Sequence, residues 1–110
     1  MKKEQQYAIN RECLEAIQRF NEYRASVVSA NGIERLRTCQ ASVIIFDDYF
    51  LLRSYNTLVA FIDRKTDTLY DVLRYVYGYT STSAQHIAKF RHDYGGERYG
   101  CTRELTWRSV

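Results

Sequence analysis

The sequence predicts an α+β fold: an antiparallel sheet of four to five strands, with a long N-terminal helix and a shorter second helix packed on one face. Between residues 42 and 74, apolar runs rich in β-branched and aromatic residues alternate with polar turns, which is typical of an antiparallel meander. The segments on either side show helical spacing of apolar residues. Each helix needs an apolar surface to pack on, and the sheet supplies one.

Length and composition favour one domain over residues 1–110. A chain of 110 residues with 45% hydrophobic and 26% charged residues can bury a single modest core. No apolar run is long enough to span a bilayer and residues 1–6 are polar or charged, so we expect a cytoplasmic protein that makes no membrane contact. The cysteines are three and widely spaced, which favours reduced thiols: Cys13, Cys39 and Cys101.

Residues 3–30 predict one amphipathic helix. Its apolar residues recur at three- and four-residue steps and so share one face: Ile9, Cys13, Ala16, Ile17, Phe20, Tyr23 and Val27. Asn31 and Gly32 end the helix, because glycine tolerates the left-handed conformation found there. We expect the stripe to pack on the sheet in preference to a partner. Residues 33–41 fit either a connector or a first edge strand.

Four strands are expected between residues 42 and 77. They cover residues 42–46, 49–53, 58–62 and 68–74. Asp47-Asp48, residues 54–57 and an exposed hairpin tip at residues 63–67 supply the turns. The fourth strand runs into Tyr75, Tyr77 and Tyr79, which share one face if the chain stays extended.

A second helix is expected from about residue 83 to 94. Thr82 and Gln85 match a capping box within a run of hydroxyl residues, and Gly95-Gly96 ends the helix. The tail carries Leu105 and Trp107 among polar residues. We therefore expect a last strand over about residues 102–108, paired with an edge of the sheet.

No pattern in the sequence predicts catalysis, a metal or a cofactor. His86 and His92 are six residues apart and do not share a helix face as a zinc pair would. The acidic candidates fall in predicted turns, where aspartate caps its own backbone: Asp47, Asp48, Asp63 and Asp67. We therefore expect no enzyme, no metal and no cofactor. An enzyme would require His86 to face a pocket with an acidic neighbour.

Arginine and tyrosine supply most of the candidate binding residues. Arginine outnumbers lysine and there are ten tyrosines, a combination typical of contact surfaces. The candidates are Arg53, Tyr55, Arg74, Tyr77, Tyr79, His86, Lys89 and Arg91. On one shared surface, the basic side chains could hold phosphates while tyrosines stack on bases. Alternatively, the tyrosine rings are buried and the arginines solvated.

The sheet itself offers two further routes to a partner. An aromatic sheet edge could dock a protein by strand addition. An uncovered sheet face rich in tyrosine would be a contact site or the interface of a homodimer.

Two segments carry a resemblance to known proteins. Residues 54–60 read S-Y-N-T-L-V-A, and residues 82–90 read T-S-A-Q-H-I-A-K-F. Together they resemble a family of small uncharacterised proteins of phages and mobile elements in gut bacteria, over roughly residues 42–94. The resemblance implies a mobile-element protein in the cytoplasm of a bacterial host, and it implies no particular activity.

We therefore expect a non-enzymatic accessory protein that binds and inhibits or modulates a bacterial nucleoprotein, for example as an anti-CRISPR inhibitor. The net charge of +3 argues against DNA mimicry by an acidic surface, so inhibition would come from docking on protein or guide RNA. The alternative is a small DNA- or RNA-binding regulator, with phosphates held by Arg53, Arg74, Lys89 and Arg91. Strong salt dependence of binding to naked nucleic acid would favour this alternative.

Overall fold

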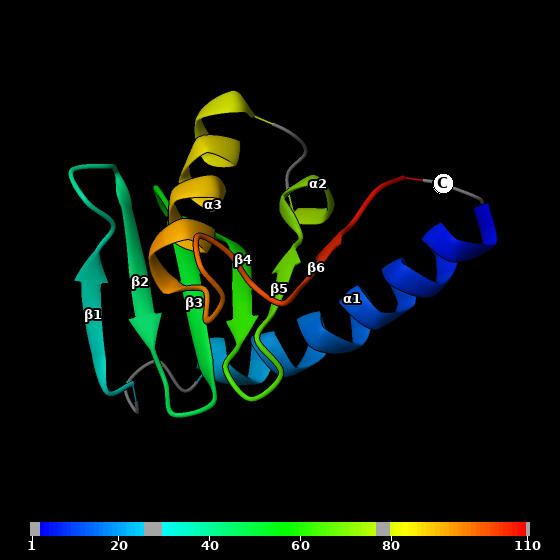
Figure 1. Ribbon diagram of the computed structural model, residues 1–110, viewed down its shortest axis with the longest axis horizontal. Helices are drawn as coiled ribbons and strands as arrows, with labels where there is room; N and C mark the ends of the chain where they lie inside the picture. Colours follow the sequence, from blue (N-terminus) through cyan, green and yellow to red (C-terminus); the bar gives the residue numbers. More distant parts are fainter. Residues whose placement is uncertain (1–2, 26–29, 77–79, 110) are drawn as a thin grey trace.

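Over the residues that it describes, 3–25, 30–76 and 80–109, the computed structural model contains six strands and three helices (Figure 1). In chain order they are α1 (Lys3–Ala25), β1 (Gly32–Arg35), β2 (Ala41–Ile45), β3 (Tyr49–Ser54), β4 (Thr57–Asp63), β5 (Thr68–Asp71), α2 (Leu73–Val76), α3 (Ser81–Tyr94) and β6 (Arg103–Thr106). The α+β class is confirmed. The predicted end of the first helix, residues 26–30, lies almost wholly outside the described residues.

The strands lie in the sheet in the same order as in the chain. β1 to β5 pair antiparallel. The turns expected at residues 47–48, 54–57 and 63–67 are confirmed, although the strands shorten the second to residues 55–56 and the third to residues 64–67. β6 pairs parallel with β5, because the chain crosses over through α3 between these two strands. The sheet therefore has one strand more than we predicted: the undecided segment contains edge strand β1, where Ile33 lies opposite Ile44.

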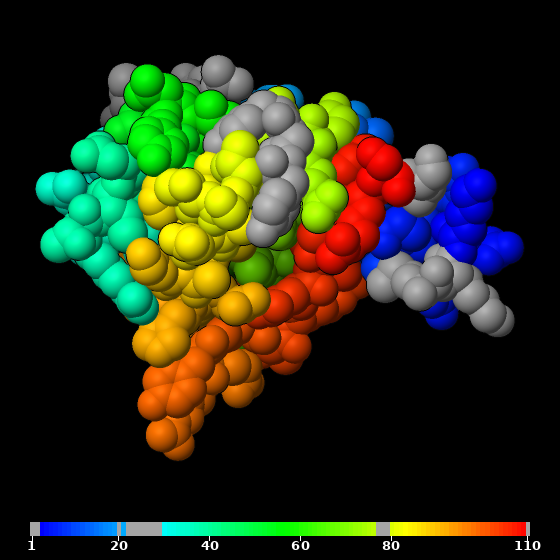
Figure 2. Space-filling view, turned by 90° about the horizontal axis from the view of Figure 1, so that it is seen from above, coloured from blue at the N-terminus to red at the C-terminus, as the bar shows by residue number. Residues whose placement is uncertain are grey.

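The two long helices cover opposite faces of the sheet, although we expected both on one face. Cys13 and Ile17 of α1 pack with one set of strand residues, and Ile87 and Phe90 of α3 pack with the other. Figure 2 shows α3 in yellow beside the cyan strands β1 and β2. Successive strand residues point to alternate faces, and the central strands are apolar at consecutive positions. That pattern requires a cover on each face.

The apolar stripe of α1 is buried at the three positions Cys13, Ala16 and Ile17. The side chains of Phe20, Tyr23 and Val27, which we placed on the same stripe, lie outside the described part. Polar contacts fix the other end of the helix to the last strand. Gln6 Nε2 donates to the Thr106 carbonyl at 3.2 Å, and Asn10 exchanges hydrogen bonds with the backbone of Arg108.

The end of the predicted fourth strand is helical. β5 stops at Asp71, whose carboxylate accepts a hydrogen bond from the Leu73 N–H at 3.1 Å and so begins α2. Arg74 and Tyr75 therefore lie on a helix. The prediction that the chain stays extended and presents an aromatic face is wrong at Tyr75. The other two tyrosines of that prediction, Tyr77 and Tyr79, lie outside the described residues.

α3 ends where we predicted and begins two residues earlier. Its N-cap is Thr80, whose hydroxyl accepts from the Ser83 N–H at 3.3 Å, in place of the predicted Thr82. Each of the four consecutive hydroxyl residues is a competent cap, so local chemistry could not select among them. At the other end, the Gly95 N–H donates to the Arg91 carbonyl.

Gly95 allows a close backbone approach that no other residue could make. A Cβ atom at this position would lie 2.0 Å from the carbonyl oxygen of Gly100, whereas one at Gly32 would meet nothing within 4 Å. We expect Gly95→Ala to lower the free energy of unfolding by about 1–3 kcal/mol, because backbone must move to relieve the clash. Gly32→Ala is the matched control, expected within about 0.5 kcal/mol of wild type in urea unfolding. Equal stability of the two variants would contradict this packing.

Asp67 fastens the loop before β6 to the β4–β5 turn. Its carboxylate accepts hydrogen bonds from the Gly96 N–H at 2.7 Å and from the N–H and hydroxyl of Thr102 at 2.8 and 2.9 Å. Burial alone would raise the pKa of Asp67, but these hydrogen bonds hold it below the usual 3.8. The folded state therefore favours the ionised carboxylate.

This preference predicts a pH-dependent loss of stability. Asparagine can adopt the backbone conformation of Asp67, but in Asp67→Asn a side-chain NH₂ donor would face the N–H and hydroxyl donors of the loop. We therefore expect Asp67→Asn to lower the free energy of unfolding at pH 7. Because the folded pKa is depressed, the stabilisation is present above about pH 3.8 and is lost as the pH falls further. Urea unfolding at several pH values should show the difference between wild type and variant shrinking in acid. Asp48→Asn, which removes only an exposed ion pair with Lys65, should show little difference at any pH.

Candidate functional site

Residues 54–60 and residues 82–90 meet where the β3–β4 turn packs on α3. Ser54, at the end of β3, places its hydroxyl oxygen 2.8 Å from His86 Nδ1 and 2.9 Å from the hydroxyl of Ser83. The three side chains are buried, with Ser54 at 0% and His86 at 4% exposure. The contact joins residues 29 and 32 positions apart, so no local pattern in the sequence could have revealed it.

The surroundings of His86 favour its neutral form. Burial lowers the pKa of His86 below the usual 6.5, and the nearby charge of Lys89 lowers it further. A serine beside a neutral histidine can form a nucleophile and its base. Here the serine hydroxyl is buried away from solvent, and none of the contacts that His86 makes with described residues involves a carboxylate. The arrangement suits a structural link between turn and helix.

Tyr55 follows Ser54 in a strained backbone conformation. Its φ of 53° lies in the left-handed region, which is uncommon for a bulky side chain. The Tyr55 N–H donates to the Gln40 carbonyl at 2.8 Å, and its ring centre lies 5.7 Å from that of His86. The side chain is still 54% exposed. Such strain is frequently retained at functional sites, so the turn is a candidate contact point.

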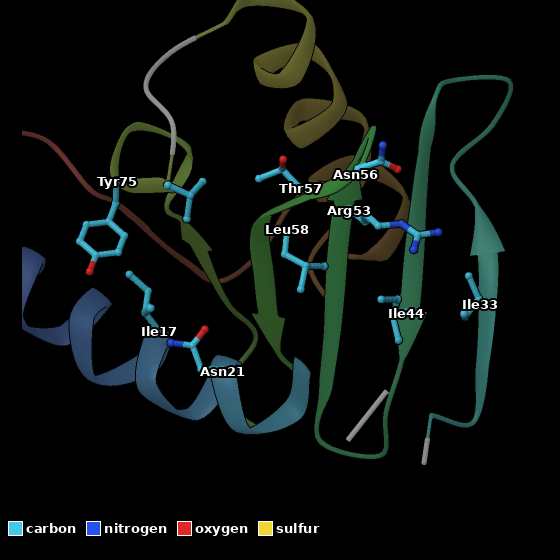
Figure 3. A pocket seen from close by; sticks show the side chains of 10 residues that line it. Ile17, Asn21, Ile33, Ile44, Arg53, Asn56, Thr57, Leu58 and Tyr75 are labelled. Atoms are coloured by element: carbon cyan, nitrogen blue, oxygen red, sulfur yellow. The ribbon is translucent and has the colours of Figure 1, made fainter. Parts of the chain in front are cut away.

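A groove opens beneath this turn on the α1 side of the sheet (Figure 3). It has a volume of about 770 Å³ and is lined by Ile17, Asn21, Ile33, Ile44, Arg53, Asn56, Thr57, Leu58, Tyr75 and Val76. Aliphatic residues from α1 and the strands make up much of the lining, and Figure 3 shows the Arg53 side chain extending toward β2. The groove thus combines aliphatic and polar side chains, with one cation among its described lining residues.

A smaller recess of about 380 Å³ adjoins the groove. It is lined by Arg35, Cys39, Gln40, Ala41, Ser42, Arg53, Tyr55 and Asn56. Arg53 and Asn56 belong to both cavities, so the β3–β4 turn forms the boundary between them. The exposed ring of Tyr55 therefore stands beside the same arginine.

Arg53 has no counter-ion among the described residues. Other arginines do: Arg37 pairs with Asp93, Arg91 with Glu104 and Arg103 with Glu12. No aspartate or glutamate is among the described residues that line the groove or the recess. Arg53 is therefore a partly buried cation that no described side chain neutralises.

The predicted binding residues do not form one surface in the part of the chain that is described. Arg53 lines the groove on the α1 side, whereas His86 packs on the α3 side. Lys89 donates to the sulfur of Cys39 at 3.4 Å, and Arg91 forms an ion pair with Glu104 at 3.5 Å. Arg74 is exposed on α2. Tyr77 and Tyr79 cannot be placed, since they lie outside the described residues.

No family model, curated protein or solved structure matches this chain. Among the described residues, no three histidine, cysteine, aspartate or glutamate side chains gather as metal ligands would. No helix in the same ranges is long and apolar enough to cross a membrane.

The state of His86 predicts how stability responds to acid. Because its folded pKa is depressed, the stabilisation from neutral His86 is present above about pH 6.5 and is lost as the pH falls below that value. We expect His86→Leu to cost about 1–3 kcal/mol at pH 7, since Ser54 loses a buried partner, and to flatten the decline in stability between pH 6.5 and 5.

The exposed histidine supplies the control. His92→Leu should keep the wild-type decline, because His86 is unchanged. Urea unfolding of the three proteins across this pH range makes the comparison. An unchanged slope in His86→Leu would show that another group causes the decline.

Proposed function

We propose that this chain is a non-enzymatic binding protein that docks on a partner protein through the groove. The observation that carries the proposal is the half-buried Arg53, without a described counter-ion, in a concave surface lined by both aliphatic and polar residues. Clefts of a few hundred cubic ångströms that combine apolar side chains with a few placed polar groups are the usual form of a binding site.

The biological setting of the proposal comes from the resemblance to phage and mobile-element proteins. Proteins of such elements act on the machinery of their host, so we propose a bacterial nucleoprotein as the target, inhibited or modulated by docking. A CRISPR effector complex is one target of this kind. The mild positive charge is compatible with a partner surface that carries carboxylates.

Protein is favoured over naked nucleic acid as the ligand because the basic residues are dispersed and largely engaged. A phosphate-binding surface needs several free cations along one track. Here Arg37, Arg91 and Arg103 are each paired with a carboxylate. The groove is lined by branched aliphatic residues such as Ile33 and Leu58, which suit aliphatic side chains better than stacked bases.

A capture experiment tests this function. Tagged protein is incubated in bacterial lysate with nuclease, and retained proteins are identified by mass spectrometry. We expect a nuclease-resistant partner whose recovery falls at least tenfold with Ile33→Glu, which puts a charge into the groove. Leu14→Glu is the matched control, since Leu14 is also an exposed aliphatic residue but does not line the groove. The purified partner complex should then lose activity when wild-type protein is added.

Two outcomes would overturn the proposal. One is recovery of only nuclease-sensitive, heterogeneous material, together with strongly salt-dependent binding to oligonucleotides, which would favour the nucleic-acid regulator. The other is an equal loss of the partner with both substitutions while both variants remain folded, which would place the contact outside the groove.

A further inference from the structure

We infer that the groove binds an extended acidic segment of the partner, with one carboxylate on Arg53 and an aliphatic side chain two residues away. This inference rests on the proposed function and specifies the chemistry of its ligand. Three features of the sheet lead to it: a basic row, an apolar row beside it, and the absence of carboxylates from the described lining.

The basic row runs across four strands on the α1 side of the sheet. Arg35 lies opposite Ser42, Ser42 opposite Arg53, and Arg53 opposite Leu58. Residues opposite one another in adjacent strands point to the same face. Two arginines therefore flank one small serine, and Leu58 packs with the α1-side core. This concentrates positive charge on one line.

The two arginines of this row are held differently. Arg35 donates through Nε to the Cys39 carbonyl at 3.1 Å and through Nη2 to the Thr38 carbonyl at 3.2 Å, so it is fixed in the recess. Arg53 makes no hydrogen bond through its side chain to the described residues, so its guanidinium retains its donors for a ligand. A carboxylate can accept two parallel hydrogen bonds from such a group, and Arg35 adds favourable charge nearby.

The apolar row lies two residues along the same strands. Ile33 is opposite Ile44, and Ile44 is opposite Leu51. Ile33 is 55% exposed at the sheet edge and lines the groove with Ile44. Side chains two residues apart on a strand are separated by about 7 Å. An extended segment lying along the strands would therefore match an acidic residue to the basic row and an aliphatic residue to the apolar row.

The size of the groove agrees with this ligand. Its volume of about 770 Å³ is within the range of cavities that hold a few side chains or a small ligand. Asn56 and Thr57 in the wall can hydrogen-bond to the segment's backbone, because amide and hydroxyl groups donate and accept. The favoured occupant is a peptide with Asp or Glu at one position and Leu, Ile or Val two positions before or after it.

Selection from a random peptide library displayed on phage tests the inference with immobilised full-length protein. Wild type should enrich peptides with this spacing, and Arg53→Glu should lose them. Arg11→Glu is the control, because Arg11 is an exposed arginine outside both cavities and should select the same peptides as wild type. Urea unfolding confirms that each variant is folded.

A double-mutant cycle then locates the contact. We expect replacing the acidic residue of a selected peptide by its amide to weaken binding to wild type at least tenfold. The same replacement should change binding to Arg53→Gln less than twofold, because the partner of the carboxylate is already absent. Equal sensitivity of the two proteins to the replacement would overturn the pairing.

The remaining outcomes separate this inference from the proposed function. If no peptide is enriched, or if the enriched peptides lack an acidic residue, the acidic segment is wrong. The proposed function would still stand in that case if a nuclease-resistant partner is captured, if Ile33→Glu abolishes its capture and if Arg53→Gln does not change it. Only the inference about the acidic segment would fail. Tight, Arg53-dependent binding of a single-stranded oligonucleotide, with no protein partner captured, would overturn both.

Discussion

Burial of the central strands on both faces is the constraint on which the rest of the structure depends. Leu51 and Leu52 are adjacent in β3, point to opposite faces and are both fully buried. A strand of this kind needs a layer above it and a layer below it. The chain meets this demand with α1 on one face and α3 on the other, each crossing part of the sheet.

The same constraint leaves one corner of the sheet less covered. α1 is fastened by polar contacts to β6, at the far edge from β1, and α3 packs over β3 and β4. β1 therefore stays largely exposed, although its neighbour β2 is mostly buried. The groove lies on the α1 side at this corner. The groove exists because two helices of these lengths do not cover all six strands.

The sequence predicts those features of the fold that are encoded over a few residues. The turns predicted at residues 47–48 and 63–67, the strands predicted at residues 49–53 and 58–62 and the end of α3 before Gly95 all have local signals and are confirmed, whereas the fourth strand ends earlier than predicted. The opposite placement of the helices was also encoded, in the consecutive apolar residues of β2, β3 and β4. We interpreted these runs as strands without drawing the consequence that both of their faces are buried.

The candidate site could be predicted only in part, because its key properties depend on distant residues. Residue type alone makes Arg53 and Tyr55 candidates for binding, and that prediction does not depend on their neighbours. The hydrogen-bond partner of His86, which is Ser54, comes from another part of the chain. The absence of a described counter-ion for Arg53 is a property of the whole surface, since it depends on where every carboxylate lies.

An irregularity in the β3–β4 pairing explains why residues next to the β3–β4 turn pack on both faces of the sheet. Leu52 pairs with Ala60 but Arg53 pairs with Leu58, so Val59 is an extra residue in β4. Because of this bulge, Val59 and Ala60 both pack on the α3 side, and Leu58 returns to the α1 side beside Arg53. Ser54 then points toward His86. In a regular ladder without the bulge, Val59 would lie opposite Arg53 and Leu58 would turn toward α3, so the bulge decides which aliphatic side chain lies next to the cation of the groove.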